Sequence, residues 1–258
     1  MLIDTNAWLG SFPFRSLRDN TPDTLIARMD RSGIDKAAVS QIEAIFHRNV
    51  QPANEKLASD VSGLTDRLIP MATVNPTYEK WEDDLEVCHE SLGMKGVRLC
   101  PAYHDYSVDG PESRGALQAC KDRGLPVFIP GRIEDPRQRS WMDPGRTVDA
   151  QGITNLMKAV PGATVVASNL RAGFSGLSLW NDEEVRDQDW FLDLSLAEVH
   201  NSLGPLAEAS GSGHLVFGTH VPFSYPGGAL VKLHQIEVDE AGRGEIMHEN
   251  AERILNIG

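Results

Sequence analysis

Side chains able to transfer protons gather in four polar segments, each of which follows an apolar run. These segments are Phe12–Arg15, His47–Asn49, Tyr103–Tyr106 and Arg132–Arg137. A histidine with an ordinary pKa of about 6.5 exchanges protons near neutrality, so His104 is a candidate acid or base. A loop histidine bonded to the backbone is the alternative for His104. The predicted catalytic set is His104, Tyr106, Glu134 and His220.

Arginine is abundant in and near the same segments, although the chain is acidic. Its planar guanidinium suits carboxylates and phosphates, which predicts that Arg98, Arg132 and Arg171 clamp a small anionic substrate. Arg98 lies inside an apolar run, where a buried charge needs a carboxylate from the protein or from a ligand. The sequence leaves open a structural network in which nearby carboxylates neutralise these arginines: Glu134, Asp135 or Asp193.

Eight short apolar runs precede or contain these residues. They are Leu2–Leu9, Lys36–Gln41, Leu68–Val74, Gly96–Cys100, Pro126–Pro130, Thr164–Ser168, Phe191–Leu196 and His214–Thr219. Longer amphipathic stretches separate them, a pattern typical of repeated β-α units around a parallel sheet. Helices are expected at Pro22–Ser32, Glu79–Leu92 and Gly244–Ile257.

This alternation predicts one α/β domain over residues 1–258, a single (β/α)8 TIM barrel with a C-terminal closing helix. The loops that follow the strands of such a barrel carry its chemistry. The predicted substrate-binding set therefore consists of residues at or after the strand ends: Asn6, Trp8, Arg15, His47, Arg98, Tyr103, Arg132, Asn169 and Arg171.

Composition excludes several classes of partner. The 258 residues include 24 Lys and Arg against 37 Asp and Glu, a net charge of -13 that repels nucleic acids and anionic membrane surfaces. Cys88, Cys100 and Cys120 lack the spacing of a disulfide framework or a metal cluster, and no apolar stretch has the length of a membrane span. We expect a cytoplasmic protein, with a homodimer as the simplest assembly through the apolar loops Phe174–Trp180 and Pro222–Pro226.

Several segments match one family in their order along the chain. Strand one contains Ile3–Gly10 (IDTNAWLG), the eighth run ends in Phe217–Pro222 (FGTHVP), and the chain closes with Asn250–Leu255 (NAERIL). These segments, with Gly96–Pro101, resemble the amidohydrolase superfamily in its amidohydrolase-2 branch, whose patterns are I-D-x-H-x-H-x-G, F-G-S-D-x-P and N-A-x-R-L/I-L. The resemblance implies a TIM-barrel hydrolase that holds one or two divalent ions.

The positions at which that family binds metal carry other residues in this chain. They are Asn6 and Trp8 in strand one, Pro130 and Asn169 after strands five and six, and His220 in place of the aspartate. Indole and proline nitrogens offer no lone pair, and amide oxygens are weak ligands. Four of these five positions thus cannot supply ordinary metal ligands, and we expect no metal site and no cofactor. Zinc held by relocated histidines, His47, His104 and His220, is the alternative.

Three functions are compatible with these residues. The first is a hydrolase or lyase that acts without the usual metal on a small anionic or oxygen-rich molecule, by acid–base and arginine-assisted electrostatic catalysis. The second is a non-catalytic descendant that binds a small ligand or a protein. The third is a metal-dependent hydrolase with relocated ligands. The sequence does not choose between C–N or C–O hydrolysis and C–C cleavage.

Overall fold

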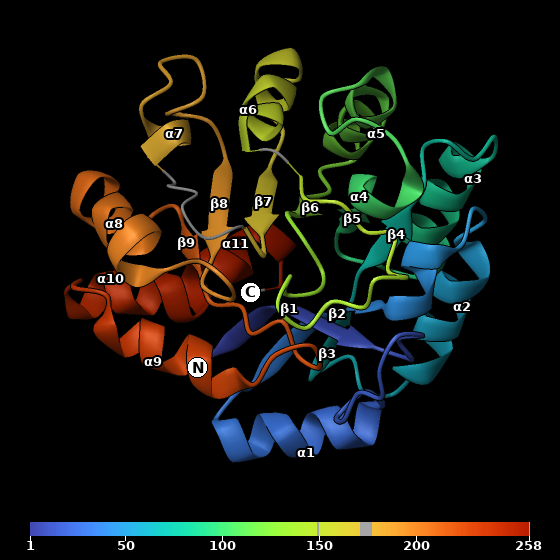
Figure 1. Ribbon diagram of the computed structural model, residues 1–258, viewed down its shortest axis with the longest axis horizontal. Helices are drawn as coiled ribbons and strands as arrows, with labels where there is room; N and C mark the ends of the chain where they lie inside the picture. Colours follow the sequence, from blue (N-terminus) through green and yellow to red (C-terminus); the bar gives the residue numbers. More distant parts are fainter. Residues whose placement is uncertain (149, 171–176, 258) are drawn as a thin grey trace.

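Parallel strands form the centre of the molecule and helices surround them (Figure 1). The computed structural model describes residues 1–148, 150–170 and 177–257. The strands are β1 (Ile3–Leu9), β2 (Lys36–Gln41), β3 (Leu68–Pro70), β4 (Ala72–Val74), β5 (Val97–Leu99), β6 (Val127–Pro130), β7 (Val165–Ser168), β8 (Trp190–Asp193) and β9 (Leu215–Val216). They pair in parallel in the orders β1-β2-β3 and β4-β5-β6-β7-β8-β9.

The two groups of strands belong to one barrel. Only Met71 separates β3 from β4, so these two strands are halves of one predicted run. At the other junction, the Thr5 amide donates to the Phe217 carbonyl at 2.9 Å and the Trp8 amide donates to the Val221 carbonyl at 2.8 Å. The first strand therefore pairs with the segment that follows the last strand. The predicted (β/α)8 barrel is confirmed.

Helices cover the outside of the strands (Figure 1). They are α1 (Pro22–Ser32), α2 (Gln51–Asp60), α3 (Trp81–Glu86), α4 (Pro101–His104), α5 (Pro111–Asp122), α6 (Ala150–Ala159), α7 (Leu177–Trp180), α8 (Gly204–Ser210), α9 (Pro226–Gln235), α10 (Glu240–Gly244) and α11 (Asn250–Leu255). A 3-10 turn spans Ile42–Phe46, and π-helical turns span Val87–Ser91, Val199–Leu203 and Glu245–Glu249. The Thr21 side chain caps α1 by accepting from the Thr24 amide, and Gly33 ends it at φ 68°.

The barrel interior is layered. The end away from the carboxyl ends of the strands is apolar. There Phe128, Phe191 and Val216 pack against Ile254 and Leu255 of α11. The predicted closing helix thus seals the barrel. Above this layer lie buried polar side chains of β1, β5 and β8, which are described below. An aromatic and aliphatic cluster caps them at the carboxyl end of the strands: Trp8, Phe12, Leu17, Ile42, Ile45, Cys100, Ile133 and Phe223.

The three cysteines contribute to the packing. Cys88, Cys100 and Cys120 are buried free thiols, and burial raises the pKa of each to about 12. They are therefore protonated at neutral pH and poor nucleophiles. Every helix in the described part of the chain is too short or too polar to cross a bilayer.

Candidate functional site

Asn6 is the centre of the buried polar layer inside the barrel. Its Nδ2 donates to Asn169 Oδ1 and to Asp193 Oδ2, both at 2.7 Å. Its Oδ1 accepts from Arg98 Nη1 at 3.0 Å and from the indole nitrogen of Trp8 at 3.2 Å. All five side chains are buried. The amide of Asn6 thus uses both its donors and its acceptor within the protein, and we call these residues, with Ser195 and His220, the interior network.

Arg98 places a cation at the centre of this network. Its guanidinium donates to Ser40 Oγ at 2.8 Å and lies 4.3 Å from the centroid of the Trp8 ring. Longer contacts reach the backbone carbonyls of three strand residues: Thr5, Ala7 and Ala38. Burial lowers the pKa of Arg98 to about 10, so it remains charged. The sequence predicted a carboxylate partner, but a hydroxyl, an amide and a π face surround the charge instead.

Asp193 supplies the negative charge of the same layer. It accepts from the side chain of Asn6, from the backbone N–H of Asn169 at 3.1 Å and from Ser195 Oγ at 2.7 Å. Burial raises the pKa of Asp193, and the hydrogen bonds from Ser195 and Asn6 act in the opposite direction. Sequence reasoning named Asp193 only as a possible partner of the arginines and did not name Ser195. The signal for Asp193 was a carboxylate inside an apolar run.

His220 closes the network toward the mouth of the barrel. Its Nε2 lies 2.6 Å from the Ile133 carbonyl, which can only accept, so Nε2 carries the proton and Nδ1 accepts from Asn169 Nδ2 at 3.0 Å. Burial lowers the pKa of His220 to about 3, and its ring stacks on Phe223 at 4.8 Å. A neutral imidazole with both nitrogens engaged does not support the predicted role in proton transfer.

His104 and Tyr106 lie at a separate position. The short helix α4 directs His104 toward the turn after β2, where its Nε2 is 3.1 Å from the Ala44 carbonyl. Burial lowers the pKa of His104 to about 4, which favours the backbone-bonded alternative over a base that works at neutral pH. Tyr106 lies beside it, with ring centroids 6.4 Å apart. Neither residue lines the cavity that contains His220.

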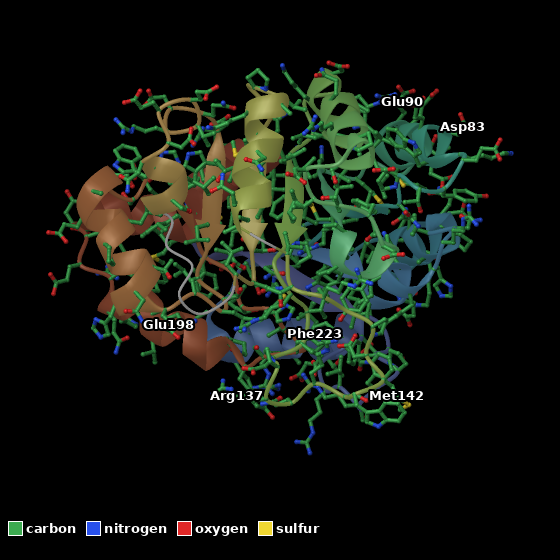
Figure 2. All side chains as sticks on the ribbon, turned by 45° about the horizontal axis from the view of Figure 1, so that its top comes forward. Asp83, Glu90, Arg137, Met142, Glu198 and Phe223 are labelled. Atoms are coloured by element: carbon green, nitrogen blue, oxygen red, sulfur yellow. The ribbon has the colours of Figure 1, made fainter. Side chains whose placement is uncertain are left out.

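A cavity of about 590 Å³ opens above the interior network, at the carboxyl ends of the strands. We call it the mouth cavity. Its wall combines charged, polar and aromatic side chains that include Arg15, Arg18, Asp19, Glu134, Asp135, Arg137, Ser195, His220, Phe223 and Tyr225. Figure 2 shows Arg137 and Phe223 on the side of the molecule opposite Asp83 and Glu90. Loops after β1, β6, β8 and β9 thus meet where a barrel of this kind carries its chemistry.

Two ion pairs set the charge of the mouth cavity. Arg15 Nη2 lies 2.8 Å from Glu134 Oε1, its Nε bonds the same carboxylate at 3.1 Å, and Nη2 also donates to the Phe223 carbonyl. Glu134 is only 4% exposed. Arg137 pairs with Asp135 at 2.7 Å and holds the pKa of that carboxyl at about 2. The wall is therefore polar, with Arg15 and Glu134 fixed against each other.

The remaining predicted binding residues are dispersed. Tyr103 donates to Asp143 at 3.2 Å, and His47 is exposed in the turn after Phe46. Arg132 lines a second cavity, described below. Arg171 lies outside the described residues, as does Phe174 of one predicted dimer loop. Of the predicted binding set, the structure places Arg15 in the wall of the mouth cavity and Asn6, Trp8, Arg98 and Asn169 in the interior network.

Comparison with known proteins identifies the fold. No family model and no curated protein matches the chain. Among solved structures, it is similar to a dihydroxybenzoic acid decarboxylase from Polaromonas (TM-score 0.77, 16% identity, 99% of this chain and 97% of that one). It is also similar to 5-carboxyvanillate decarboxylase from Sphingomonas paucimobilis (0.76, 16%, 100% and 99%) and to a candidate amidohydrolase from Staphylococcus aureus (0.72, 13%, 99% and 99%). This likeness confirms the barrel fold predicted from the sequence.

The same comparison corrects the prediction about cofactors. The Polaromonas decarboxylase was crystallised with bound manganese and the inhibitor 2-nitroresorcinol. The expectation that no cofactor is needed is therefore wrong for this class of barrel, since its members include a manganese protein. Proteins of this fold also bind small molecules, as the predicted partner class requires.

The residues of this chain do not fit a manganese ion in the arrangement observed. Within residues 1–148, 150–170 and 177–257, no three His, Cys, Asp or Glu side chains come together as a set of metal ligands. Manganese prefers oxygen and imidazole ligands. Asn6 Oδ1 accepts from Arg98, and His220 has both nitrogens engaged. The fold class and the donor set thus disagree, and every functional test of this protein has to include manganese.

Proposed function

We propose that this protein binds a small anionic or oxygen-rich molecule in the mouth cavity. The observation that carries the proposal is the Arg15–Glu134 pair, held at 2.8 Å in the wall of a cavity of about 590 Å³ at the carboxyl ends of the strands. A guanidinium donates to carboxylate and carbonyl oxygens, while Phe223 offers an apolar surface for the body of the ligand. The interior network forms the floor.

The proposal uses fewer residues than the sequence suggested. Arg15 and Glu134 remain as candidate ligand contacts. His104, His220 and Tyr106 are left out, because the first two are neutral, buried and bonded to backbone carbonyls, and Tyr106 faces another cavity. Arg98 is left out because the protein itself surrounds its guanidinium.

Calorimetric titration tests the proposal. The ligand is 5-carboxyvanillate, the compound named in one of the similar decarboxylases, and its dimethyl ester is the uncharged control. We expect saturable binding of the acid, and a loss of about tenfold or more in Arg15→Gln, because a charge-assisted hydrogen bond contributes about 1.5–3 kcal/mol. Arg253→Gln, on the far side of the barrel near Asp189, is the matched control. Equal binding by acid and ester would contradict the anionic preference.

The titration is run on chelator-treated protein and again with MnCl2. If Arg15→Gln weakens binding in both conditions, the cavity rather than the ion selects the ligand. If binding requires manganese and is indifferent to Arg15, the proposed site is incorrect.

An acid–base enzyme that uses the same cavity is the second candidate. The observation in its favour is Glu134, a carboxylate almost withdrawn from solvent and oriented by Arg15 within the cavity. Mass spectrometry of the titrated mixtures distinguishes the two functions, because an enzyme releases carbon dioxide or a hydrolysis product and a binding protein returns the ligand unchanged. One domain over residues 1–258, a cytoplasmic location and a homodimer stay predictions.

A further inference from the structure

A second cavity, of about 740 Å³, adjoins the mouth cavity and shares Asp135, Arg137 and Leu196 with it. It lies between the loop after β6, the segment after β8 and helix α9. Figure 2 shows Arg137 and Glu198, one from each of the two loops, on the same side of the molecule. We call it the side cavity.

Positive charge predominates in the wall of the side cavity. Arg132, Arg137 and Lys232 line it, against Asp135 and Glu198. Asp135 and Arg137 form an ion pair at 2.7 Å and offset each other, while Glu198 accepts from the amide of Asn201 at 2.6 Å and keeps its charge, so Arg132 and Lys232 together exceed it by one positive charge. An excess of cations is notable in a chain whose net charge is -13. The field in this cavity thus favours an anion.

Lys232 is the fixed cation of this wall. It projects from α9, and its Nζ donates to the Leu194 carbonyl at 2.9 Å and to the Ser195 carbonyl at 2.6 Å. An ammonium group has three donors, so one N–H is left after these two bonds. No carboxylate of the described residues forms an ion pair with it. Burial lowers the pKa of Lys232, while Asp193 and Glu198 act to raise it.

Part of the wall is apolar. Leu196, Ala197 and Val199 line it, from the segment that follows β8. A ligand that fills such a cavity needs an apolar body as well as a charged group. The carbonyls of Leu194 and Ser195 hold the ammonium group of Lys232 in place. The charged group of a ligand that binds this ammonium therefore has a defined position.

We propose that the side cavity is a second ligand site, which binds an organic carboxylate with an apolar body and places the carboxylate on Lys232 and Arg132. This site adjoins the mouth cavity but binds its ligand through other cations, so it does not depend on the function proposed for Arg15 and Glu134. Lys232 also connects the side cavity with the interior network. The Ser195 carbonyl accepts from Lys232, and the Ser195 hydroxyl belongs to the interior network.

Calorimetric titration with 4-phenylbutyrate tests the site, with 4-phenylbutanol and inorganic phosphate as comparison ligands. We expect saturable binding of the carboxylate, and binding at least tenfold weaker for the alcohol and for phosphate, because each lacks one half of the recognition. Lys232→Met keeps most of the apolar stem and removes the charge, which should weaken binding at least tenfold. Phosphate binding as tight as that of the carboxylate would overturn the need for an apolar body.

Two further variants make the result independent of how well Lys232→Met folds. Gln235 is exposed at the end of α9 and lines the side cavity, so Gln235→Glu adds a repelling charge without disturbing the core, and we expect a severalfold loss. Arg253→Gln, near Asp189 and outside both cavities, is the control and should leave 4-phenylbutyrate binding unchanged. The proposal fails if the wild type does not bind, if both Lys232→Met and Gln235→Glu bind as tightly as the wild type, or if Arg253→Gln weakens binding as much as they do.

Discussion

The interior network and the mouth cavity are adjacent but satisfy their polar groups in different ways. In the interior network, the donors and acceptors of Asn6 and His220 are all used within the protein, and the side chains are buried. In the mouth cavity, charged pairs such as Arg15–Glu134 border open space, and Arg15 is one-third exposed. The interior therefore keeps its polar groups for the barrel itself, whereas the cavity leaves charged groups at the edge of open space.

This difference is informative because the two regions carry the residues that the sequence placed in one site. A buried polar network is stable only when each member has a partner, so a change inside it should lower stability strongly. A pair at the edge of a cavity contributes little to stability, because water screens it and can replace either partner. Stability and ligand binding should thus respond to different substitutions.

The largest expected effect is on Asn6. Asn6→Leu has a similar volume but removes one hydrogen-bond partner from each of two buried charges, Asp193 and Arg98, which keep other partners. We expect a loss of about 3–5 kcal/mol in the free energy of unfolding, because each hydrogen bond to a charged group contributes about 1.5–3 kcal/mol. Urea denaturation measures it, with the exposed Asn201→Leu as control. A loss below about 1 kcal/mol would show that the network is not a structural unit.

The barrel could be predicted from the sequence because its signals are local. Each apolar run has the length of a strand, and the closing helix carries its own buried stripe at Ile254 and Leu255. The resemblance also grouped Asn6, Trp8, Asn169 and His220 correctly as neighbours at one end of the strands. Periodicity and motif order were sufficient for that level of detail.

The contacts within the group could not be predicted, because they join residues far apart in the chain. Asn6 bonds Asn169 and Asp193, which lie 163 and 187 positions away. A sequence does not show that these groups satisfy one another and leave none for a substrate. The orientation of His104 could not be predicted for a different reason: the direction of a four-residue helix, α4, decides whether its ring faces the mouth or the Ala44 carbonyl.

The next effect concerns His220 and acid. Its pKa falls from 6.5 in the unfolded chain to about 3 in the fold, so the folded state binds fewer protons below pH 6.5. The stability that the neutral His220 contributes is fully present above pH 6.5. It is lost as the pH falls toward 3, by up to about 1.4 kcal/mol per pH unit for one proton. His220→Gln should remove that slope. Thermal unfolding measured from pH 7 to 4 checks it.

His104 shares the sign of this effect, because burial also lowers its pKa, to about 4. The wild-type slope has further contributors, because burial also lowers the pKa of His214 and raises that of Asp4 to about 6, which acts in the opposite direction. His220→Gln should therefore remove only the part of the slope that belongs to His220. The exposed His47→Gln serves as control and should leave the slope unchanged. An acid slope in His220→Gln as steep as that of the wild type would mean that His220 accepts a proton in the folded protein, which would restore it as a candidate base.

The smallest effect on stability is expected in the mouth cavity, where Arg15→Gln breaks the pair with Glu134. The Glu134 side chain is only 2% exposed, but Arg15 is one-third exposed, so its truncation opens that carboxylate to the water of the cavity and the loss should be about 1–2 kcal/mol. Urea denaturation alongside Asn6→Leu measures both variants under one condition. A loss of several kcal/mol in Arg15→Gln would make this pair part of the structural core, and its proximity to the cavity would then say nothing about a ligand. A small loss, together with weakened binding of 5-carboxyvanillate, separates the two regions as the contacts predict: the interior maintains the barrel, and the cavity wall selects what enters it.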